Sequence, residues 1–223
     1  MDGNKTMKTL MRQWTLILAL MMIGLSVSAA PYRFEEGTHY VALSVPYETA
    51  DPDRIEVTEY FSYRCQHCFR FDPVVEQWKS SLPQDVLFNR TPAMWARQDE
   101  VLTQTYYALQ SIGQLEAVHP AIFEAIHLQG RQFPDPVEMA EYLAELGIDT
   151  EAFSKAYKSF GVRSNAQQAR ARANMYRARA VPAIMVNGKY RISGDLAGSN
   201  EAMLEVADFL IERERRARAK TSN

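Results

Sequence analysis

The feature that most constrains the fold is the position of the two cysteines between a predicted strand and a predicted helix. Residues 54–63, RIEVTEYFSY, are rich in β-branched and aromatic residues, as is typical of a buried strand. Cys65 and Cys68 follow, and from Cys68 to Trp78 apolar residues recur at helical spacing. Residues 86–91 predict a second strand. The sequence therefore predicts a strand–helix–strand unit with Cys65 at the first turn.

The rest of the chain predicts a helical block, a hairpin and a last helix. Residues 98–176 have helical periodicity and propensity, with glycines between the segments and no strand pattern. Residues 181–194 hold two short apolar runs joined by Asn-Gly, the dipeptide most typical of a tight hairpin. An amphipathic helix capped by Ser199 or Asn200 is expected to close the chain. This order predicts an α/β fold interrupted by an all-helical subdomain.

The N-terminus predicts an export signal. A basic stretch precedes the uncharged, apolar residues 14–27, and small residues follow. The apolar run is short for a membrane span, which needs about 20 residues. We expect cleavage after Ala29, with Met7 as a second possible start and an uncleaved N-terminal anchor as the alternative. In either case the folded part lies outside the cytoplasm, where disulfides persist.

Three roles are open to the cysteine pair: a structural bridge, a metal site and redox chemistry. A chain of 223 residues, 47% of them hydrophobic, can bury a core without a staple, and a bridge across two residues would restrict the unfolded chain little. A structural zinc site usually has four ligands, and only His67 lies nearby. His119 and His127 could share a helix face, but the interpretation as ordinary histidines is favoured. Redox chemistry without a metal is therefore expected.

A cysteine at the first turn of a helix has a physical reason to be a thiolate. The unpaired N–H groups and the positive end of the helix dipole lower the pKa of a thiol at the position of Cys65. Cys68 lies one turn further on and is expected to be the more buried, resolving thiol. His67 can donate to the Cys65 sulfur or add positive charge. Stabilising the thiolate favours the reduced form, so the disulfide becomes a stronger oxidant.

Two further positions are candidates for the site. Glu59 lies in the predicted strand, and if the strand alternates it can lie beneath the cysteines with a raised pKa and exchange protons with Cys68. The alternative is an outward-facing carboxylate; Arg90 is the candidate partner. At Val181-Pro182 the local sequence favours the ordinary trans bond.

The motifs E-x-F-S-x-x-C-x-H-C, ending at Cys68, and V-P-A-x-x-V-N-G-K-Y, beginning at Val181, resemble the DsbA family of periplasmic thiol:disulfide oxidoreductases. The resemblance covers nearly the whole chain after the signal. It implies a thioredoxin-like fold split by a helical insertion. The expected organisation is a signal peptide at 1–29, a thioredoxin-like domain in two parts at 30–97 and 177–223, and the insertion at 98–176.

The resemblance also implies roles for single residues. Cys65 would be the nucleophile, Cys68 the resolving thiol and Glu59 the buried acid. The Val181-Pro182 bond would be cis and face the cysteines, with the Val181 backbone free to pair with an extended substrate segment.

Two departures from the family pattern and one neighbouring charge bear on redox tuning. Gln66 stands where the best-known members have proline, and Arg64 adds a positive charge beside Cys65. Arg90 stands where the family has a buried lysine; it keeps the charge but does not lose its proton. The redox potential is therefore not carried over from the family.

The predicted function is an exported, periplasmic thiol:disulfide oxidoreductase that introduces disulfides into unfolded or newly exported Cys-containing proteins, with no cofactor. The resemblance implies reoxidation by a membrane quinone-linked partner. The alternatives are a reductase or isomerase, and a thioredoxin-like binding or assembly module. Isomerases usually add a dimerisation domain, which is not visible, so a monomer is expected. A net charge of −2 and the lack of a nucleic-acid motif argue against nucleic-acid binding.

Overall fold

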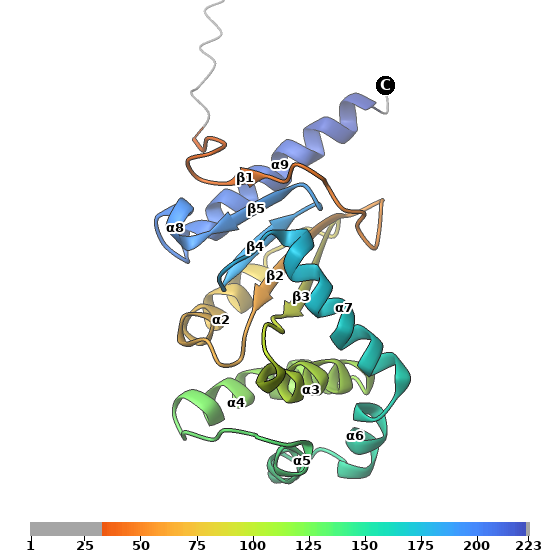
Figure 1. Cartoon of the computed structure of the whole chain (residues 1–223). Coiled ribbons are helices and arrows are strands. Elements are labelled where there is room, and N and C mark those ends of the chain that lie inside the picture. Colours follow the sequence, from red (N-terminus) through yellow and green to blue (C-terminus); the bar gives the residue numbers. More distant parts are fainter. Residues whose placement is uncertain (1–32, 222–223) are drawn as a thin grey trace, which may run out of the picture. The chain divides into compact units, whose positions relative to one another are not determined.

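The computed structural model describes residues 33–221, so the predicted signal peptide, residues 1–29, lies outside the described residues. A compact unit begins at Phe34 and contains one sheet. Its strands are β1 (Val41–Ala42), β2 (Ile55–Phe61), β3 (Val86–Pro92), β4 (Ala183–Val186) and β5 (Tyr190–Ser193). Their order in space is β1-β5-β4-β2-β3 (Figure 1). Only the β2–β3 pair is parallel among these strands.

The helices fall between the strands as the sequence pattern predicts. Helix α2 (Gln66–Lys79) connects β2 to β3. The helical block between β3 and β4 consists of a short 3₁₀ helix η1 (Arg97–Asp99), α3 (Glu100–Ser111), α4 (Leu115–His127), α5 (Pro136–Glu145), α6 (Thr150–Tyr157) and α7 (Phe160–Tyr176). Two further helices, α8 (Gly194–Ala197) and α9 (Ala202–Thr221), follow β5. The predicted α/β fold with a helical insertion is confirmed.

Local capping explains where several of these helices begin. The carboxylates of Asp135 and Asp149 accept two backbone N–H groups each at the first turns of α5 and α6, and the Ser159 hydroxyl accepts one at α7. Ser199 accepts the Ala202 N–H at 3.1 Å, so one of the two predicted caps of the last helix is present.

The hairpin between β4 and β5 follows from its turn residues. Asn187 and Gly188 both have positive φ, 50° and 66°, which is the conformation of a type I′ turn. A Cβ at position 188 would lie 2.1 Å from the Tyr47 carbonyl oxygen, so only glycine fits. The buried Glu214 of α9 accepts from Asn187, Lys189 and Tyr190, which fixes the hairpin to the last helix.

Two packed layers bring the cysteines to the boundary between the sheet and the helical block. Apolar residues of α2 and α9 cover one face of the sheet, where Phe71 and Leu210 pack with Val57 and Ile184. At the end of β2 the contacts differ: Phe61, Tyr63 and Cys68 pack against the helical block rather than against α9. In Figure 1 this block lies below the carboxyl end of β2. The turn after β2 therefore lies between the core of the sheet and the core of the helical block.

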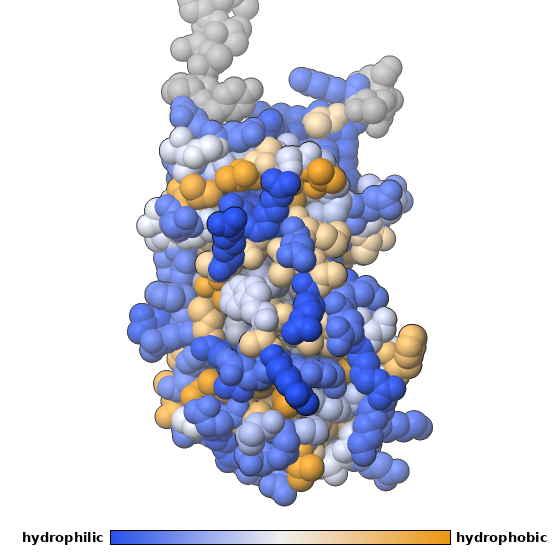
Figure 2. Space-filling model, viewed as in Figure 1, coloured by the Kyte–Doolittle hydropathy of each residue, from blue (hydrophilic) through white to orange (hydrophobic). Residues whose placement is uncertain are grey.

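The sequence pattern did not predict β1 and α8. A two-residue strand has no measurable alternation, and β1 exists because Val41 and Ala42 pair with Arg191 and Tyr190 of β5. Within residues 33–221, no helix is both long and apolar enough to cross a bilayer. Figure 2 shows one face of the molecule as largely hydrophilic, with hydrophobic side chains in several patches separated by polar ones.

Candidate active site

The turn between β2 and α2 places the two sulfurs in different surroundings. Cys65 is the N-cap of α2, with extended backbone (φ −88°, ψ 117°), and its side chain is part-buried. Cys68 is fully buried in the core shared with the helical block. Gln66 and His67, between them, are exposed. Both cysteines are free thiols. Cys65 is thus open to solvent, and Cys68 is not.

The surroundings of Cys65 favour its thiolate. The Cys68 thiol beside it is the largest cause; burial opposes the charge, and the backbone N–H groups of Cys68 and His67 and the His67 imidazole assist. Together they lower the pKa of the Cys65 thiol from 9.0 to about 6. The helix N-terminus and His67 are among these causes, as the sequence indicated, whereas the dominant contribution of Cys68 was not foreseen.

The environment of Cys68 has the opposite effect. Burial raises the pKa of the Cys68 thiol far above its ordinary value, and the hydrogen bond and charge of Cys65 and the charge of Glu59 add to this. A buried thiolate would lack solvation, so Cys68 is held as the thiol. One sulfur of the pair is therefore ionised near neutral pH while its neighbour keeps its proton.

A loop 116 residues further along the chain faces the exposed sulfur. The Cys65 Sγ donates to the Val181 carbonyl oxygen at 3.5 Å. The Val181-Pro182 peptide bond is cis, so the trans bond favoured by the local sequence is wrong, and the cis bond implied by the family resemblance is confirmed. Val181 is part-buried and Pro182 buried. The tertiary fold therefore brings this backbone to the Cys65 sulfur.

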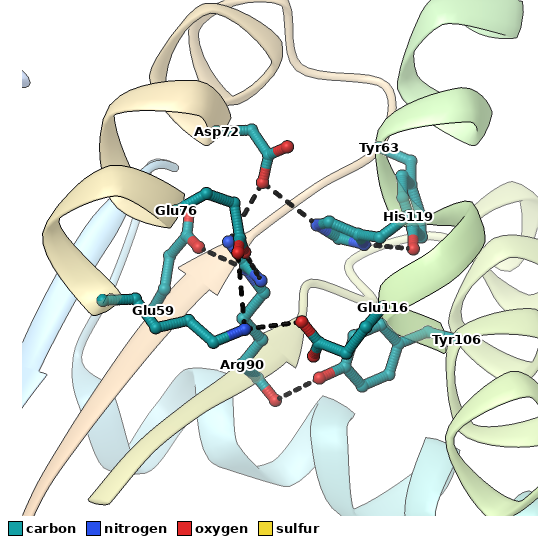
Figure 3. A network of polar contacts seen from close by, with 9 residues as sticks. Glu59, Tyr63, Asp72, Glu76, Arg90, Tyr106, Glu116 and His119 are labelled. Atoms are coloured by element: carbon teal, nitrogen blue, oxygen red, sulfur yellow. Dashed lines mark hydrogen bonds and ion pairs between the residues drawn. The ribbon is translucent and has the colours of Figure 1, made fainter. Parts of the chain in front are cut away.

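A buried cluster of charges lies in the same region, on β2, β3 and α2 (Figure 3). Glu59 and Arg90 are opposite each other in the β2–β3 register, and the Arg90 Nε donates to the Glu59 carboxylate at 2.7 Å. Arg90 also contacts Asp72 at 3.0 Å through Nη2 and Glu76 at 2.7 Å through Nη1. The expected partnership of Glu59 with Arg90 is present, and the outward-facing alternative is wrong because Glu59 is only 2% exposed.

The Arg90 guanidinium contacts three carboxylates in this cluster, so its single positive charge balances the negative charge of each only in part. Burial raises the pKa of Glu59 above its ordinary value; Arg90 offsets this only in part, and the charge of Asp72 acts in the same direction as burial. Burial opposes the charge of Arg90, but Glu59 and Asp72 outweigh it and raise the pKa of the guanidinium. Arg90 is therefore a fixed cation, and Glu59 is the carboxyl best placed to hold a proton.

The remaining predicted tuning residues lie on the surface side of the turn. Gln66 is the first residue of α2 and points to solvent. Arg64 donates from Nη2 to the carbonyl oxygens of Gln98 and Gln132, at 3.4 and 3.2 Å. Its guanidinium is thus directed toward the helical block.

Sequence reasoning missed several residues of this site. Asp72 lies one helical turn after Cys68, and that spacing would have been the signal for it. Tyr63 and His119 hydrogen-bond at 2.6 Å, and His127 contacts the Tyr63 carbonyl oxygen at 2.8 Å. These contacts join segments more than 50 residues apart, so no local pattern predicts them. Within residues 33–221, no cluster of three His, Cys, Asp or Glu side chains could hold a metal ion.

A cavity of about 600 Å³ lies elsewhere on the molecule. Its lining includes Tyr47, Thr58, Tyr107, Arg172 and Tyr176, and neither cysteine contributes to it. The part-buried Cys65 sulfur therefore lies outside this cavity.

A sheet of this order, with a C-x-x-C pair where the first helix begins and a cis-proline loop facing it, defines a thioredoxin-like thiol:disulfide oxidoreductase. A family model described as a DSBA-like thioredoxin domain matches residues 84–203, a stretch that begins after the cysteine pair. The thiol:disulfide interchange protein DsbA of Azotobacter vinelandii is 42% identical over 210 residues, which cover 91% of this chain and 98% of that protein. The chain belongs to the DsbA family.

Solved structures agree with this assignment. The crystal structure of Pseudomonas aeruginosa DsbA is 41% identical and superposes with a TM-score of 0.81 over 83% of this chain and 97% of that one. The oxidoreductase DsbA of Xylella fastidiosa is 32% identical, with a TM-score of 0.77 over 82% of this chain and 98% of that one. The predicted fold class and oxidoreductase activity are confirmed.

We expect the Cys65 thiol of the reduced protein to be half ionised near pH 6, measured by thiolate absorbance at 240 nm, with Cys65→Ser as the blank. A folded pKa of about 6, below the ordinary 9.0, stabilises the reduced state. This contribution is complete above pH 9 and is lost as the pH falls through 6. A midpoint near pH 9 would contradict the assignment of Cys65 as the activated thiol.

Proposed function

We propose that this chain is an oxidant that passes its Cys65–Cys68 disulfide to other proteins. The observation that carries the proposal is the Cys65 sulfur at the N-terminus of α2, with a pKa lowered to about 6, facing the Val181 carbonyl. When the reduced form of a disulfide contains a stabilised thiolate, reduction of that disulfide is more favourable. Such a disulfide therefore oxidises other thiols. The same exposure makes Cys65, rather than the buried Cys68, the sulfur that a substrate attacks.

The proposed reaction has two exchange steps. A substrate thiolate attacks the Cys65 sulfur, a mixed disulfide forms, and Cys68 leaves as a thiolate. The raised pKa of Cys68 drives it to take up a proton, for which Glu59 is the proposed donor. A second substrate thiolate then attacks the substrate sulfur of the mixed disulfide and releases Cys65 as its stable thiolate. The substrate gains a disulfide, and the enzyme retains both electrons as a dithiol.

Substrate contacts are proposed for the cis-proline loop. An extended peptide that paired with the Val181 backbone would pass directly over Cys65, because the Val181 carbonyl lies 3.5 Å from its sulfur. Pro182 would hold that backbone in place. In this proposal residues 30–97 and 177–223 form the thioredoxin-like domain and residues 98–176 the insertion. Gln66, Arg64 and His67 would tune the redox potential, Arg64 through its contacts with the helical block.

The setting is inferred from the family and the N-terminal sequence. The predicted signal peptide would deliver the chain to the periplasm, where newly exported Cys-containing proteins are the proposed substrates. A membrane quinone-linked protein is the proposed reoxidant, and the chain is proposed to act as a monomer.

The redox potential tests the proposed direction. We expect equilibration with glutathione to give a potential well above that of thioredoxin, which is about −270 mV. The purified chain, without its signal, should also oxidise a reduced, unfolded Cys-containing protein. A potential near −270 mV would favour the reductase, and no exchange at all would favour a binding or assembly module.

A further inference from the structure

Two histidines of α4 hold one residue of the active-site turn. His127 Nε2 lies 2.8 Å from the Tyr63 carbonyl oxygen, and because a carbonyl only accepts, Nε2 carries the hydrogen. His119 Nδ1 lies 2.6 Å from the Tyr63 hydroxyl oxygen. Tyr63 is two residues before Cys65. The helical block is thus tied to the turn that carries the nucleophile.

Only His119 also reaches the buried charges. Its Nε2 lies 3.3 Å from the Asp72 Oδ1, close enough for an ion pair, although it is not aligned as a hydrogen bond. Both side chains are nearly buried, 4% and 7% exposed. Figure 3 shows His119 between the Tyr63 hydroxyl on one side and Asp72 on the other. His119 therefore connects the turn before Cys65 to the cluster around Arg90.

The cluster has more negative than positive groups. Arg90 faces Glu59, Asp72 and Glu76, and the first two are buried. Carboxylates that share one buried cation retain a proton more readily than isolated ones. The charged or titratable groups around His119 are Tyr63 from the turn, Glu59 and Arg90 from the strands, Asp72 from α2, Tyr106 from α3 and Glu116 from α4. Lys79 of α2 pairs with Glu116 at 2.5 Å.

We propose that His119 is a positioning residue for disulfide exchange: it shares with Glu59 the proton retained by this cluster, and its hydrogen bond to Tyr63 places its positive charge beside the active-site turn. The inference rests on the proposed function of the cysteine pair. A protonated His119 can donate from Nδ1 to the Tyr63 oxygen, and its Nε2 side lies within ion-pair distance of Asp72, so the positive charge has a negative neighbour. The positive charge favours the negative Cys65 thiolate, and with it the reduced protein.

A variant without the His119 charge is expected to have a less stable reduced form, and should therefore be a weaker oxidant than wild type. The difference exists only where the imidazole carries its charge and the Cys65 thiol is ionised. A purely structural role would change the equilibrium equally at every pH.

The test is the equilibrium constant with glutathione between pH 5 and pH 9 for wild type and His119→Gln, whose amide can still bond Tyr63 but carries no charge. We expect the variant's constant to favour its oxidised form by about three- to tenfold near pH 7, where Cys65 is a thiolate. The difference should shrink toward pH 5, as Cys65 takes up its proton, and the variant should match wild type at pH 9. A tenfold change corresponds to about 30 mV. His127→Gln is the matched control: it keeps a donor to the Tyr63 carbonyl and does not touch Asp72, so it should follow wild type.

A second measurement uses the unaltered protein. The ¹⁵N shifts of the His119 ring are expected to show a greater protonated fraction in the reduced than in the oxidised form at the same pH. Parallel profiles of wild type and His119→Gln, or ring shifts independent of redox state, would overturn the inference. Wild type that does not exchange with glutathione would instead overturn the proposed function, and the ring shifts, recorded on chemically reduced and oxidised protein, would still decide the role of His119.

Discussion

Replacing Cys65 with serine is expected to abolish disulfide exchange, reducing the rate to that of the uncatalysed reaction. In the proposed reaction the thiolate at the start of α2 forms the mixed disulfide, and a serine hydroxyl neither ionises near neutral pH nor forms a disulfide. The measurement is the rate at which the oxidised chain introduces disulfides into a reduced, unfolded protein.

Cys68→Ser is the matched control for this prediction. It removes the buried sulfur but leaves Cys65 at the surface, so the variant should still react with small disulfides and accumulate a stable mixed disulfide that mass spectrometry detects. Activity retained in Cys65→Ser, or trapping through Cys68 in that variant, would contradict the assignment of Cys65 as the nucleophile. In Cys68→Ala, which has no donor at this position, the Cys65 thiol should ionise at a higher pH than in wild type.

Replacing Arg90 with methionine is expected to destabilise the fold by about 3–5 kcal/mol, because it leaves Glu59 and Asp72 buried without their cation. The free energy of unfolding in urea at pH 7 measures this. The loss should shrink at low pH: a carboxyl whose folded pKa is raised opposes folding above that pKa, and the penalty disappears below the unfolded value of 4.5.

Arg90→Lys separates charge from geometry. A lysine keeps one cation in the cluster but cannot reach three carboxylates with fixed donors, so its loss should be smaller than that of Arg90→Met. Equal losses for the two variants would show that guanidinium geometry, rather than charge, stabilises the cluster. No loss for Arg90→Met would show that the carboxyls are neutral at pH 7.

The order of elements could be predicted because its signals are local. The β-branched and aromatic run of β2, the helical spacing after Cys68 and the Asn187-Gly188 turn each depend on neighbours within a few residues. The buried position of Glu59 was expected only if the strand alternates; in the structure all seven residues of β2 are buried. The short strand β1 had no such signal, since its two residues are a strand only because β5 lies beside them.

The candidate site was predictable in part for the same reason. Cys65, Cys68 and His67 belong to one turn, so their relation is set by the helix that begins there. On local grounds the trans bond was favoured at Val181-Pro182, which is wrong, because X-Pro bonds take either form and the tertiary context decides. The family resemblance, which reflects whole folds, indicated the correct isomer.

By itself the sequence determined a thiol pair at the start of a helix after a buried strand, and it predicted a redox-active sulfur at the position of Cys65. Only the tertiary structure decided what surrounds that sulfur: the Val181 carbonyl, and the cluster of Glu59, Asp72 and Arg90 with His119 beside it. The reason is physical. A helix terminus is built from consecutive residues, whereas the desolvation and charges that raise or lower a pKa depend on groups that folding brings together from distant parts of the chain.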